Sequence, residues 1–360
     1  MLTNERLLIL TTDREVYDAV KYVKPLLKYE VSVQDYTAAI QTEEQYAQLL
    51  GQFDKVLFAD AGSNARSSAL AEKRIFPAIN AGKNVICAIP FEPGKIDEMK
   101  KASSHKNVSF LYSAEPYSHA EKGLNVKIES SRIKTINTPV IFVAGVSEGT
   151  QKFYIQLALR QKFITRGYHV SQIGTKNYCE IFGFHSIPSF LSSSDLSELS
   201  KIILLNHFVK KIELTEKPDV IIIGVPGGLF PLDSEFHNKF GITAFEMSQA
   251  VCPDAVVLST LYEDFTREYF EEINLTMKYR FGYEADCFNI SDLKFDWAEA
   301  QVSHKPCYMT IDPVLVSKKK TECSIPGKPV FHILDDADAE QMTEYVIDKL
   351  SEYAMTGIVD

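Results

Sequence analysis

Gly145, Gly149 and Lys152 have the residue types and the spacing of a loop that holds phosphate groups. They fall within residues 139–163, where an apolar run is followed by a glycine-containing turn and a helical pattern. A helix N-terminus presents backbone N–H groups and a partial positive charge, and glycines let that backbone approach phosphate oxygens. A lysine in this position reaches the outer phosphates. The stretch therefore predicts a strand, an anion-binding loop and a helix.

Two positions depart from the usual phosphate-binding pattern. Gln151 stands where a glycine normally precedes the lysine, and Phe153 stands where a Ser or Thr hydroxyl normally holds magnesium. From Gly145 to Lys152 there are seven steps, one more than in GxxxxGK, and this longer loop resembles the dethiobiotin-synthetase-like branch of P-loop proteins. The loop residues that we expect to contact phosphate are Gly145, Ser147, Glu148, Gly149, Thr150 and Lys152.

A second glycine-containing turn is predicted beside this loop. Residues 218–232, PDVIIIGVPGGLFPL, contain a strongly apolar strand that runs into Gly227 and Gly228. Near-continuous apolar strands of this kind are buried on both faces of a parallel sheet. We expect the two glycines to bring the backbone of this turn close to the bound anion.

The second usual magnesium support is missing from this strand. In the dethiobiotin-synthetase-like pattern an acidic residue ends it, but Gly224 stands at that position. The acidic side chains left as replacements are Asp233, Glu235 and the loop residue Glu148. Because Phe153 also removes the hydroxyl, we expect an anion-binding helix N-terminus without the usual magnesium supports, and no dedicated metal site.

Two histidines are further candidates for chemistry. His185 lies on a predicted loop near the carboxyl ends of the strands, where it would serve as a base or a phosphate contact unless it is simply packed there. His304 and Cys307 have HxxC spacing, but a zinc site needs four ligands and this is the only local pair. We therefore keep His185, with Asp233 and Glu235, as residues at the edge of the site.

The composition limits the class of protein. The chain has 360 residues, 45% of them hydrophobic and 24% charged, which is typical of a globular protein with its own core. A net charge of −10 disfavours a general nucleic-acid binder, which needs a basic face. No segment approaches the roughly 20 apolar residues that span a bilayer. The six cysteines are scattered without CxxC pairs, so we expect reduced thiols in a cytoplasmic protein.

Strand and helix patterns alternate along the chain, which predicts an α/β fold with parallel sheets. The polar segment 131–139, which ends in proline, separates two such series. We therefore expect a Rossmann-like α/β domain at 1–137 and a P-loop-NTPase-like, doubly wound domain with a C-terminal helix at 138–360. No GxGxxG follows a strand of the first domain, so the dinucleotide fingerprint is absent.

The individual elements are predicted from runs and periodicity. The predicted strands are Leu7–Leu10, Lys55–Phe58, Asn84–Ile89, Val108–Tyr112, Val140–Ala144, Tyr168–Ile173, Val220–Ile223 and Ala255–Leu258. The predicted helices include Ser67–Ala81, Lys152–Arg166, Leu196–Leu214 and Asp338–Tyr353. Asp195 and Glu198 fit a capping box at the start of the third of these helices.

Four stretches resemble one protein family: GVSEGTQKFYIQLALRQKF, GYHVSQIGTKNYCEIFGFHSIPSF, PDVIIIGVPGGLFPL and FGITAFEMSQAVCPDAVVLS. They cover most of residues 139–262 and look like the peptide maturation system proteins of clostridial and related bacteria, which occur beside radical SAM enzymes and short cysteine-rich precursor peptides. The resemblance implies a role in making a ribosomally synthesised, post-translationally modified peptide. It implies the precursor peptide and the radical SAM maturase as partners and leaves an oligomer open. It supplies no reaction and no catalytic residues.

Three interpretations of function stay open. The first is an accessory protein in peptide maturation whose altered loop binds ATP or another nucleotide, a phosphorylated group or the precursor peptide. The second is an active ATP-dependent enzyme that resembles dethiobiotin synthetase and activates a carboxylate with a replacement metal ligand. The third is a structural partner without a ligand, since any doubly wound fold needs strand–turn–helix units. Residues 115–140 either add an exposed strand that holds a peptide or connect the two domains.

Overall fold

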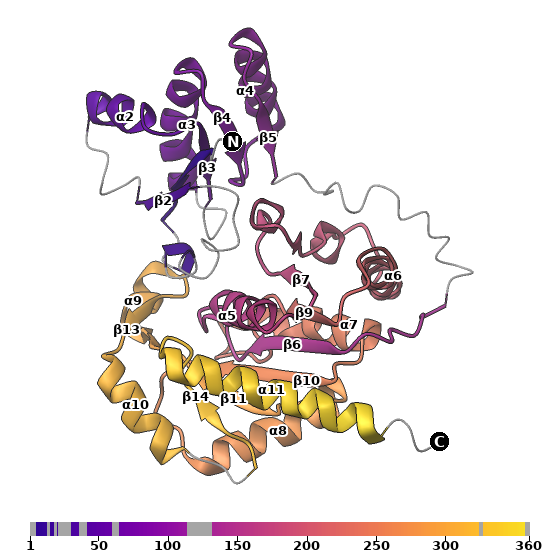
Figure 1. The fold of residues 1–360 in the computed structure, drawn as a ribbon. Helices are drawn as coiled ribbons and strands as arrows, with labels where there is room; N and C mark the ends of the chain where they lie inside the picture. Colours follow the sequence, from indigo (N-terminus) through magenta and orange to yellow (C-terminus); the bar gives the residue numbers. More distant parts are fainter. Residues whose placement is uncertain are drawn as a thin grey trace. The chain divides into compact units, whose positions relative to one another are not determined.

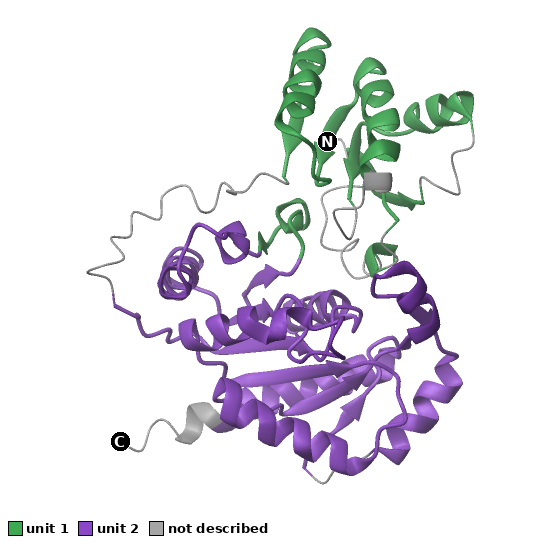
Figure 2. Cartoon of the chain, turned by 180° about the vertical axis from the view of Figure 1, so that it is seen from behind, with its two compact units in different colours: residues 1–119, 176–186 green, residues 120–175, 187–360 purple. Residues whose placement is uncertain are grey.

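The structure is a computed structural model, and it describes residues 5–12, 15–17, 20, 30–35, 42–59, 65–113, 132–323 and 327–356. Side chains are described in these ranges except at 65–67 and 353–356. The chain divides by its contacts into two compact units, which Figure 2 colours separately: unit 1 comprises residues 1–119 and 176–186, and unit 2 comprises residues 120–175 and 187–360. The predicted peptide-holding strand at 115–140 lies mostly outside the described residues.

Unit 1 is built on a five-stranded parallel sheet of order β2-β1-β3-β4-β5, the order of flavodoxin-like doubly wound sheets (Figure 1). Its strands are β1 (Arg6–Leu10), β2 (Glu30–Gln34), β3 (Lys55–Phe58), β4 (Asn84–Cys87) and β5 (Phe110–Tyr112). Its described helices include α2 (Glu43–Leu50), α3 (Ala65–Asn80) and α4 (Pro93–His105), and segment 176–186 contains η3 (Cys179–Phe182) and β8 (His185–Ser186). Side chains from alternate strand positions, such as Leu8 and Leu10, pack against these helices because successive strand side chains point to opposite faces.

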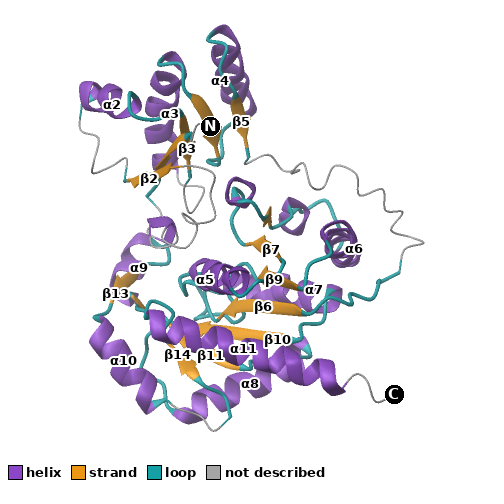
Figure 3. Ribbon diagram, in the orientation of Figure 1, coloured by secondary structure: helices purple, strands orange, loops and turns teal. Residues whose placement is uncertain are grey.

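Unit 2 is built on a second sheet, of order β14-β11-β10-β6-β9-β7-β8 (Figure 3). The strands β6, β7, β9, β10, β11 and β14 pair in parallel, and β12 and β13 form a separate antiparallel pair, called the hairpin below, whose connection contains α9. The strands are β6 (Val140–Gly145), β7 (Val170–Gly174), β9 (Val220–Gly224), β10 (Ala255–Thr260), β11 (Cys287–Ile290), β12 (Leu293–Phe295), β13 (Tyr308–Thr310) and β14 (Val330–Phe331). The helices are α5 (Lys152–Thr165), η4 (Ser189–Ser192), α6 (Glu198–Glu216), η5 (Asn238–Gly241), α7 (Ile242–Ala250), α8 (Arg267–Phe281), α9 (Trp297–Ser303), α10 (Pro313–Glu322) and α11 (Asp336–Thr356).

The central strands of unit 2 are buried on both faces. Every residue of β6, β9 and β10 is buried, because helices cover the sheet on either side. Residues of α6, α7 and α8 join the core cluster on one face, and α5 and α11 pack together. This packing explains why these strands appear in the sequence as continuous apolar runs rather than as alternating ones.

The amino ends of both sheets share a repeated hydrogen-bonded ring. At four places an aspartate stands one residue before a strand, and its carboxylate accepts the backbone N–H of a residue near the start of the neighbouring strand. The pairs are Asp54 with Arg6 (2.9 Å), Asp219 with His169 (2.7 Å), Asp254 with Val140 (2.8 Å) and Asp286 with Val256 (2.8 Å). In each pair the backbone N–H of the aspartate also donates to the carbonyl of the same partner. These rings fix the parallel register where each strand begins.

The α/β architecture that the sequence predicts is confirmed, with one correction of detail. Helix α6 begins after Ser197, whose hydroxyl accepts the N–H of Ser200 at 3.3 Å, so the predicted capping box of Asp195 and Glu198 is wrong. A serine is as good an N-cap as an aspartate, and the chain uses the later one. Among the described residues, no helix combines the length and the apolar character that crossing a bilayer requires.

Candidate functional site

The predicted loop connects β6 to α5 and is folded tightly on the end of the strand. A Cβ on Gly145 would lie 2.1 Å from the Thr150 hydroxyl and 3.1 Å from the Lys152 Nζ, so only glycine fits there. The Thr150 hydroxyl donates to the Ser147 carbonyl at 3.0 Å, which closes the loop on itself. The N-terminal turn of an α-helix carries N–H groups that no carbonyl of that helix accepts. The loop thus holds the first turn of α5 at the carboxyl end of a central strand.

The Lys152 side chain is buried, with 4% of its surface exposed, and its ammonium group lies inside the loop. Its Nζ donates to the carbonyls of Ser147 at 2.6 Å and Gly227 at 2.8 Å, and more weakly to that of Glu148 at 3.4 Å. A buried charge is costly unless it is compensated by hydrogen bonds, and these carbonyls provide that compensation. The structure therefore brings the lysine loop and the Gly227 turn together around one positive charge.

Gly149 lies directly beneath Tyr308, the first residue of β13. Its N–H donates to the Tyr308 hydroxyl at 3.2 Å, and the Ser147 hydroxyl lies 3.3 Å from the same oxygen. A Cβ on Gly149 would lie 2.5 Å from the Tyr308 ring, so glycine is required here by close packing. Burial raises the pKa of Tyr308, which keeps the phenol neutral at ordinary pH. Sequence reasoning did not find Tyr308, because it is distant in the chain and belongs to no motif.

Gln151 keeps the backbone conformation that a glycine would have in this loop. Its φ is +58°, in the left-handed region that residues with a Cβ rarely adopt. Its side-chain Nε2 donates to the Asp292 carboxylate at 2.6 Å, and both side chains are buried. A charge-assisted hydrogen bond of this kind offsets the strain of the left-handed backbone. Asp292, which follows β11, is an acidic side chain that the fold brings to the loop, and no local pattern of residues pointed to it.

The two positions that normally support magnesium are filled by other groups. Phe153 is fully buried in the core. At Gly224 a Cβ would lie 2.3 Å from the amide nitrogen of Gln156, so the Gln156 side chain fills the space that a side chain at 224 would need. The Gln156 Nε2 donates to the Lys152 carbonyl at 3.1 Å, while its buried Oε1 has no partner within the described residues. These residues do not fit a magnesium ion at its usual place.

The other predicted acidic residues are either exposed or engaged in contacts of their own. The Asp233 carboxylate accepts the backbone N–H groups of Glu235 at 2.8 Å and Phe236 at 2.6 Å, which caps its own turn. The Glu235 carboxylate lies 2.8 Å from the Nδ1 of His304, and the Glu148 side chain is exposed. Over the residues that the structure describes, three or more His, Cys, Asp or Glu side chains do not gather as metal ligands would.

The turn after β9 is tightly packed against the loop. A Cβ on Gly228 would lie 2.6 Å from the Asn238 side chain and 2.7 Å from the Val146 carbonyl. Asn238 begins a left-handed turn in which Asn238, Lys239 and Phe240 all have φ near +50° before Gly241. Left-handed backbone costs about 1–2 kcal/mol for each residue with a Cβ. The Asn238 Nδ2 donates to the Phe230 carbonyl at 2.6 Å, which ties this turn to the Gly228 segment.

A buried chain of hydrogen bonds joins the loop to the strands beside it. The Ser259 hydroxyl at the end of β10 donates to the Thr150 carbonyl at 2.5 Å, and the Asn289 Nδ2 donates to the Ser259 hydroxyl at 2.8 Å. The Asn289 Oδ1 in turn accepts the Ile333 N–H at 2.7 Å. All of these groups are buried, so the loop is anchored by polar contacts across the carboxyl ends of three strands.

No GxSxG nucleophile elbow was expected from the sequence, but the stretch 145–149, GVSEG, does match the GxSxG pattern of hydrolase nucleophiles. That pattern needs a strained turn at the serine and a base beside its hydroxyl. Ser147 is not among the residues with positive φ, and its hydroxyl lies beside the Tyr308 phenol. A neutral phenol is not a base, so the geometry favours an anion-binding loop over a nucleophilic serine.

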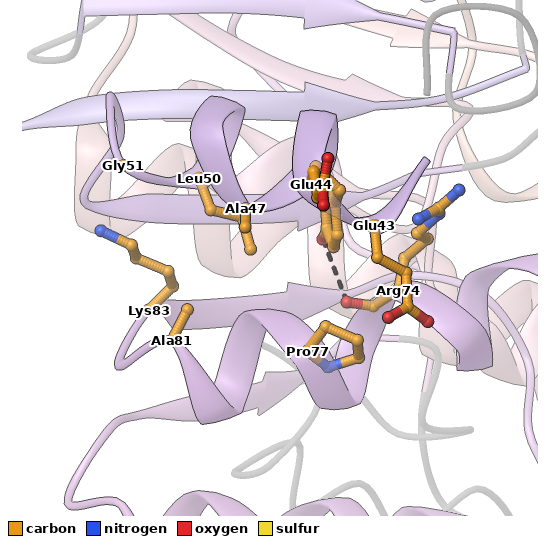
Figure 4. Close-up of a pocket in the computed structure, with 10 residues that line it drawn as sticks. Glu43, Glu44, Ala47, Leu50, Gly51, Arg74, Pro77, Ala81 and Lys83 are labelled. Carbon is orange, nitrogen blue, oxygen red and sulfur yellow. Dashed lines mark hydrogen bonds between the residues drawn. The ribbon is translucent and has the colours of Figure 1, made fainter. Parts of the chain in front are cut away.

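The remaining predicted residue, His185, and the hollow in Figure 4 both lie among the residues grouped with unit 1, although β8 also ends the strand order of the seven-stranded sheet. His185 is half-buried on β8, in the segment 176–186 that is grouped with unit 1. The hollow, of about 440 Å³, lies between α2 and α3 of unit 1, and the Tyr46 hydroxyl beside it donates to the Arg74 carbonyl (Figure 4). Doubly wound sheets bind ligands outside the carboxyl ends of their strands, whereas helix side chains line this hollow. It is therefore the weaker candidate for a ligand site.

The comparisons with known proteins bear on the fold alone. No family model matches the sequence, and no curated protein matches it. Among solved structures, a DUF1611 family protein from Anabaena variabilis superposes with a TM-score of 0.63 and 12% sequence identity, over 97% of this chain and 99% of that one. The likeness over nearly the whole of both chains supports one shared α/β architecture.

Proposed function

We propose that unit 2 binds a phosphate-bearing ligand at the loop between β6 and α5 without magnesium at the usual two positions. The observation that carries this proposal is the buried ammonium of Lys152, which lies between the loop and the Gly227 turn at the N-terminus of α5. A helix N-terminus and a fixed cation together attract anions. The ligand is ATP, another nucleotide or a phosphorylated group.

The setting that we propose is the maturation of a ribosomally synthesised peptide, in which this protein is an accessory component. The support is the resemblance of residues 139–262 to peptide maturation system proteins. In this setting the precursor peptide and a radical SAM maturase are the partners, and the bound anion is a nucleotide or a phosphorylated group handled during that process. The interior of a cell is the expected compartment, because the cysteines are free thiols.

Calorimetric titration with ATP and with inorganic pyrophosphate, each with and without magnesium, tests the proposal. We expect binding whose affinity changes little when magnesium is removed. Lys152→Met keeps most of the apolar stem but removes the charge, and it should weaken binding about 10- to 150-fold, the value of a hydrogen bond to a charged group. Lys162→Met, on the same helix and paired with Glu340 at 2.7 Å, is the matched control and should bind as the wild type does.

Each outcome has a definite meaning. If neither wild-type protein nor Lys162→Met binds either anion, or if Lys152→Met binds as well as wild type, the proposal is wrong. Binding that requires magnesium and is accompanied by ATP turnover would instead support the carboxylate-activating alternative. Thermal unfolding of each variant separates loss of binding from loss of the fold.

A further inference from the structure

The Tyr308 hydroxyl lies against two loop groups that the proposed anion would also contact. It accepts the N–H of Gly149 at 3.2 Å and lies 3.3 Å from the Ser147 hydroxyl. These are two of the groups expected to contact phosphate, and a backbone N–H has one hydrogen to donate. A phosphate oxygen and the phenol oxygen therefore cannot both accept a well-aligned hydrogen bond from Gly149.

The ring of Tyr308 adds a steric obstacle to the same place. Its atoms lie within 3 Å of where a Cβ on Gly149 would be, so the ring covers that face of the loop. The Tyr308 side chain is half-buried against the small cluster of Phe236, Leu261, Phe295 and Ala300, which is separate from the main core of unit 2. Edge-to-face packing on Phe295, with centroids 5.6 Å apart, holds it there.

The element that carries Tyr308 is small enough to move. β12 and β13 form three residue pairs and are connected through α9. Phe295 and Ala300 of this segment belong to the small cluster with Phe236 and Leu261 rather than to the main core of unit 2. The residue after Tyr308 is Met309, whose surface is 41% exposed, so the outer side of the hairpin has little packing. The ends of the hairpin are held by the Tyr262 N–H on the Leu293 carbonyl at 2.8 Å and the Ile311 N–H on the Asp292 carbonyl at 2.7 Å. The hairpin is therefore hinged at its base and weakly held above the loop.

We propose that Tyr308 is a built-in competitor of the anion, and that phosphate binding displaces its phenol from Gly149 together with the β12–β13 hairpin. This inference rests on the proposed function, since it names what regulates the same loop. In the closed state the phenol satisfies the loop amide, and in the open state the ligand does so. The affinity for the anion then includes the free energy of opening the hairpin.

The protein contains an intrinsic fluorescent probe of this motion. Its single tryptophan, Trp297, follows β12 and makes a tilted ring contact with Phe295 at a centroid distance of 4.5 Å, and the same Phe295 ring packs on Tyr308. A displacement of the hairpin changes the surroundings of this indole. We expect the fluorescence of Trp297 to change as pyrophosphate or ATP is titrated into the wild-type protein, with the midpoint that calorimetry gives.

Tyr308→Phe removes the hydroxyl and keeps the ring. Without the phenol oxygen the closed state loses its hydrogen bond to Gly149 while the bound state is unchanged, so affinity for pyrophosphate should rise about two- to tenfold, the value of one net hydrogen bond. Tyr283→Phe is the matched control, because Tyr283 is another buried tyrosine whose hydroxyl has no partner within the described residues. It should leave the affinity within twofold of wild type.

The opposite results overturn the inference. If Tyr308 helps to bind the anion, Tyr308→Phe will weaken binding, and if it has no part, the affinity will not change. Either result with intact binding by the wild type leaves the proposed function standing and removes only the competitor. Absence of binding by the wild type, Tyr308→Phe and Tyr308→Ala alike would remove the proposed function itself. A thermal unfolding temperature close to that of the wild type shows that each variant is folded.

Discussion

In both units of this chain, aspartates placed one residue before a strand tie neighbouring strands together at the amino end of the sheet. Asp54 does so in unit 1, and Asp219, Asp254 and Asp286 do so in unit 2. The carboxyl ends of the two sheets differ. Unit 2 has buried polar side chains there, whereas the described part of unit 1 has Thr11 after β1 and apolar residues at the ends of β3 and β4.

This difference indicates that the two ends of a sheet serve different purposes. The amino-end rings contribute to the fold, and both units have them. Buried polar groups cost free energy unless they are satisfied, so a sheet that gathers Lys152, Ser259, Asn289 and Asp292 around one loop needs a reason beyond stability. A ligand at the carboxyl ends of the strands is that reason in doubly wound sheets. Among the described residues, the comparison therefore supports the proposal that unit 2 binds the ligand.

The largest expected effect comes from restoring an acid at the carboxyl end of β9. Gly224→Asp places a carboxylate against the Gln156 amide, in a position where even a Cβ would lie 2.3 Å from it. A buried, uncompensated charge and a steric clash together should destabilise unit 2 by more than about 3 kcal/mol. Chemical denaturation measures this change. The same substitution in unit 1, Gly94→Asp, lies at a helix start in open space and should be neutral or slightly stabilising.

If Gly224→Asp lost less than about 1 kcal/mol, the Gln156 side chain would have to move easily, and the space at 224 would not be closed. In that case lack of space would not explain why position 224 carries no acidic metal ligand.

A medium effect is expected at Gly149. Gly149→Ala forces a methyl group against the Tyr308 ring and should cost about 1–3 kcal/mol, the range for overpacking. Adding Tyr308→Ala removes the opposing ring and should restore most of that loss. Gly94→Ala is the control in unit 1, where no atom lies within 4 Å of the added methyl. Thermal unfolding of the single and double variants gives the coupling, and an additive result would place the strain elsewhere.

The smallest effect concerns the shared amino-end rings and depends on pH. The Arg6 N–H holds the pKa of Asp54 below its ordinary value of 3.8, while burial raises the pKa of Asp286 above it. The lowered pKa means that the Asp54 carboxylate adds stability above about pH 4 and that this is lost as the pH falls through the folded-state pKa. The raised pKa of Asp286 gives the opposite sign, since burial favours its protonated form.

Asp54→Asn should therefore lower stability at pH 7 by less than about 1 kcal/mol, because the carboxylate is half-exposed, and should lower it less at pH 3. Asp286→Asn should lose less at pH 7 than at pH 3. Unfolding curves at the two pH values measure both. An equal loss at both pH values for Asp54→Asn would mean that the hydrogen-bonded shape, rather than the charge, is what matters.

The sequence predicted the parts of the molecule that depend on local pattern. The runs that became β1, β3, β6, β9 and β10 are apolar because these strands are buried, and burial of both faces leaves a plain signal. The glycine-and-lysine loop was found from residue spacing, and its partner turn at Gly227 was found from the same strand pattern. The strand β2, at the edge of its sheet, was missed because only Val31 within it is buried.

What the sequence could not predict depends on residues that meet only in the folded chain. Tyr308 is separated from Gly149 by 159 positions and Asp292 from Gln151 by 141, so no local pattern links them. The role of Gln156 was also hidden, since a polar residue one turn after the lysine looks like part of a solvated stripe. Its amide is instead buried beside Gly224. Contacts of this kind follow from the order of the strands rather than from any motif.

The close contact between Gly224 and Gln156 also constrains how this protein can change over generations. An acid at position 224 finds no room while Gln156 is present. Shortening Gln156 first removes the hydrogen bond to the Lys152 carbonyl at 3.1 Å and leaves a hole in a closely packed interior. Either first step costs stability before any metal can bind. A lineage with this pair of residues therefore loses stability at the first step of any gradual route to a magnesium site at β9.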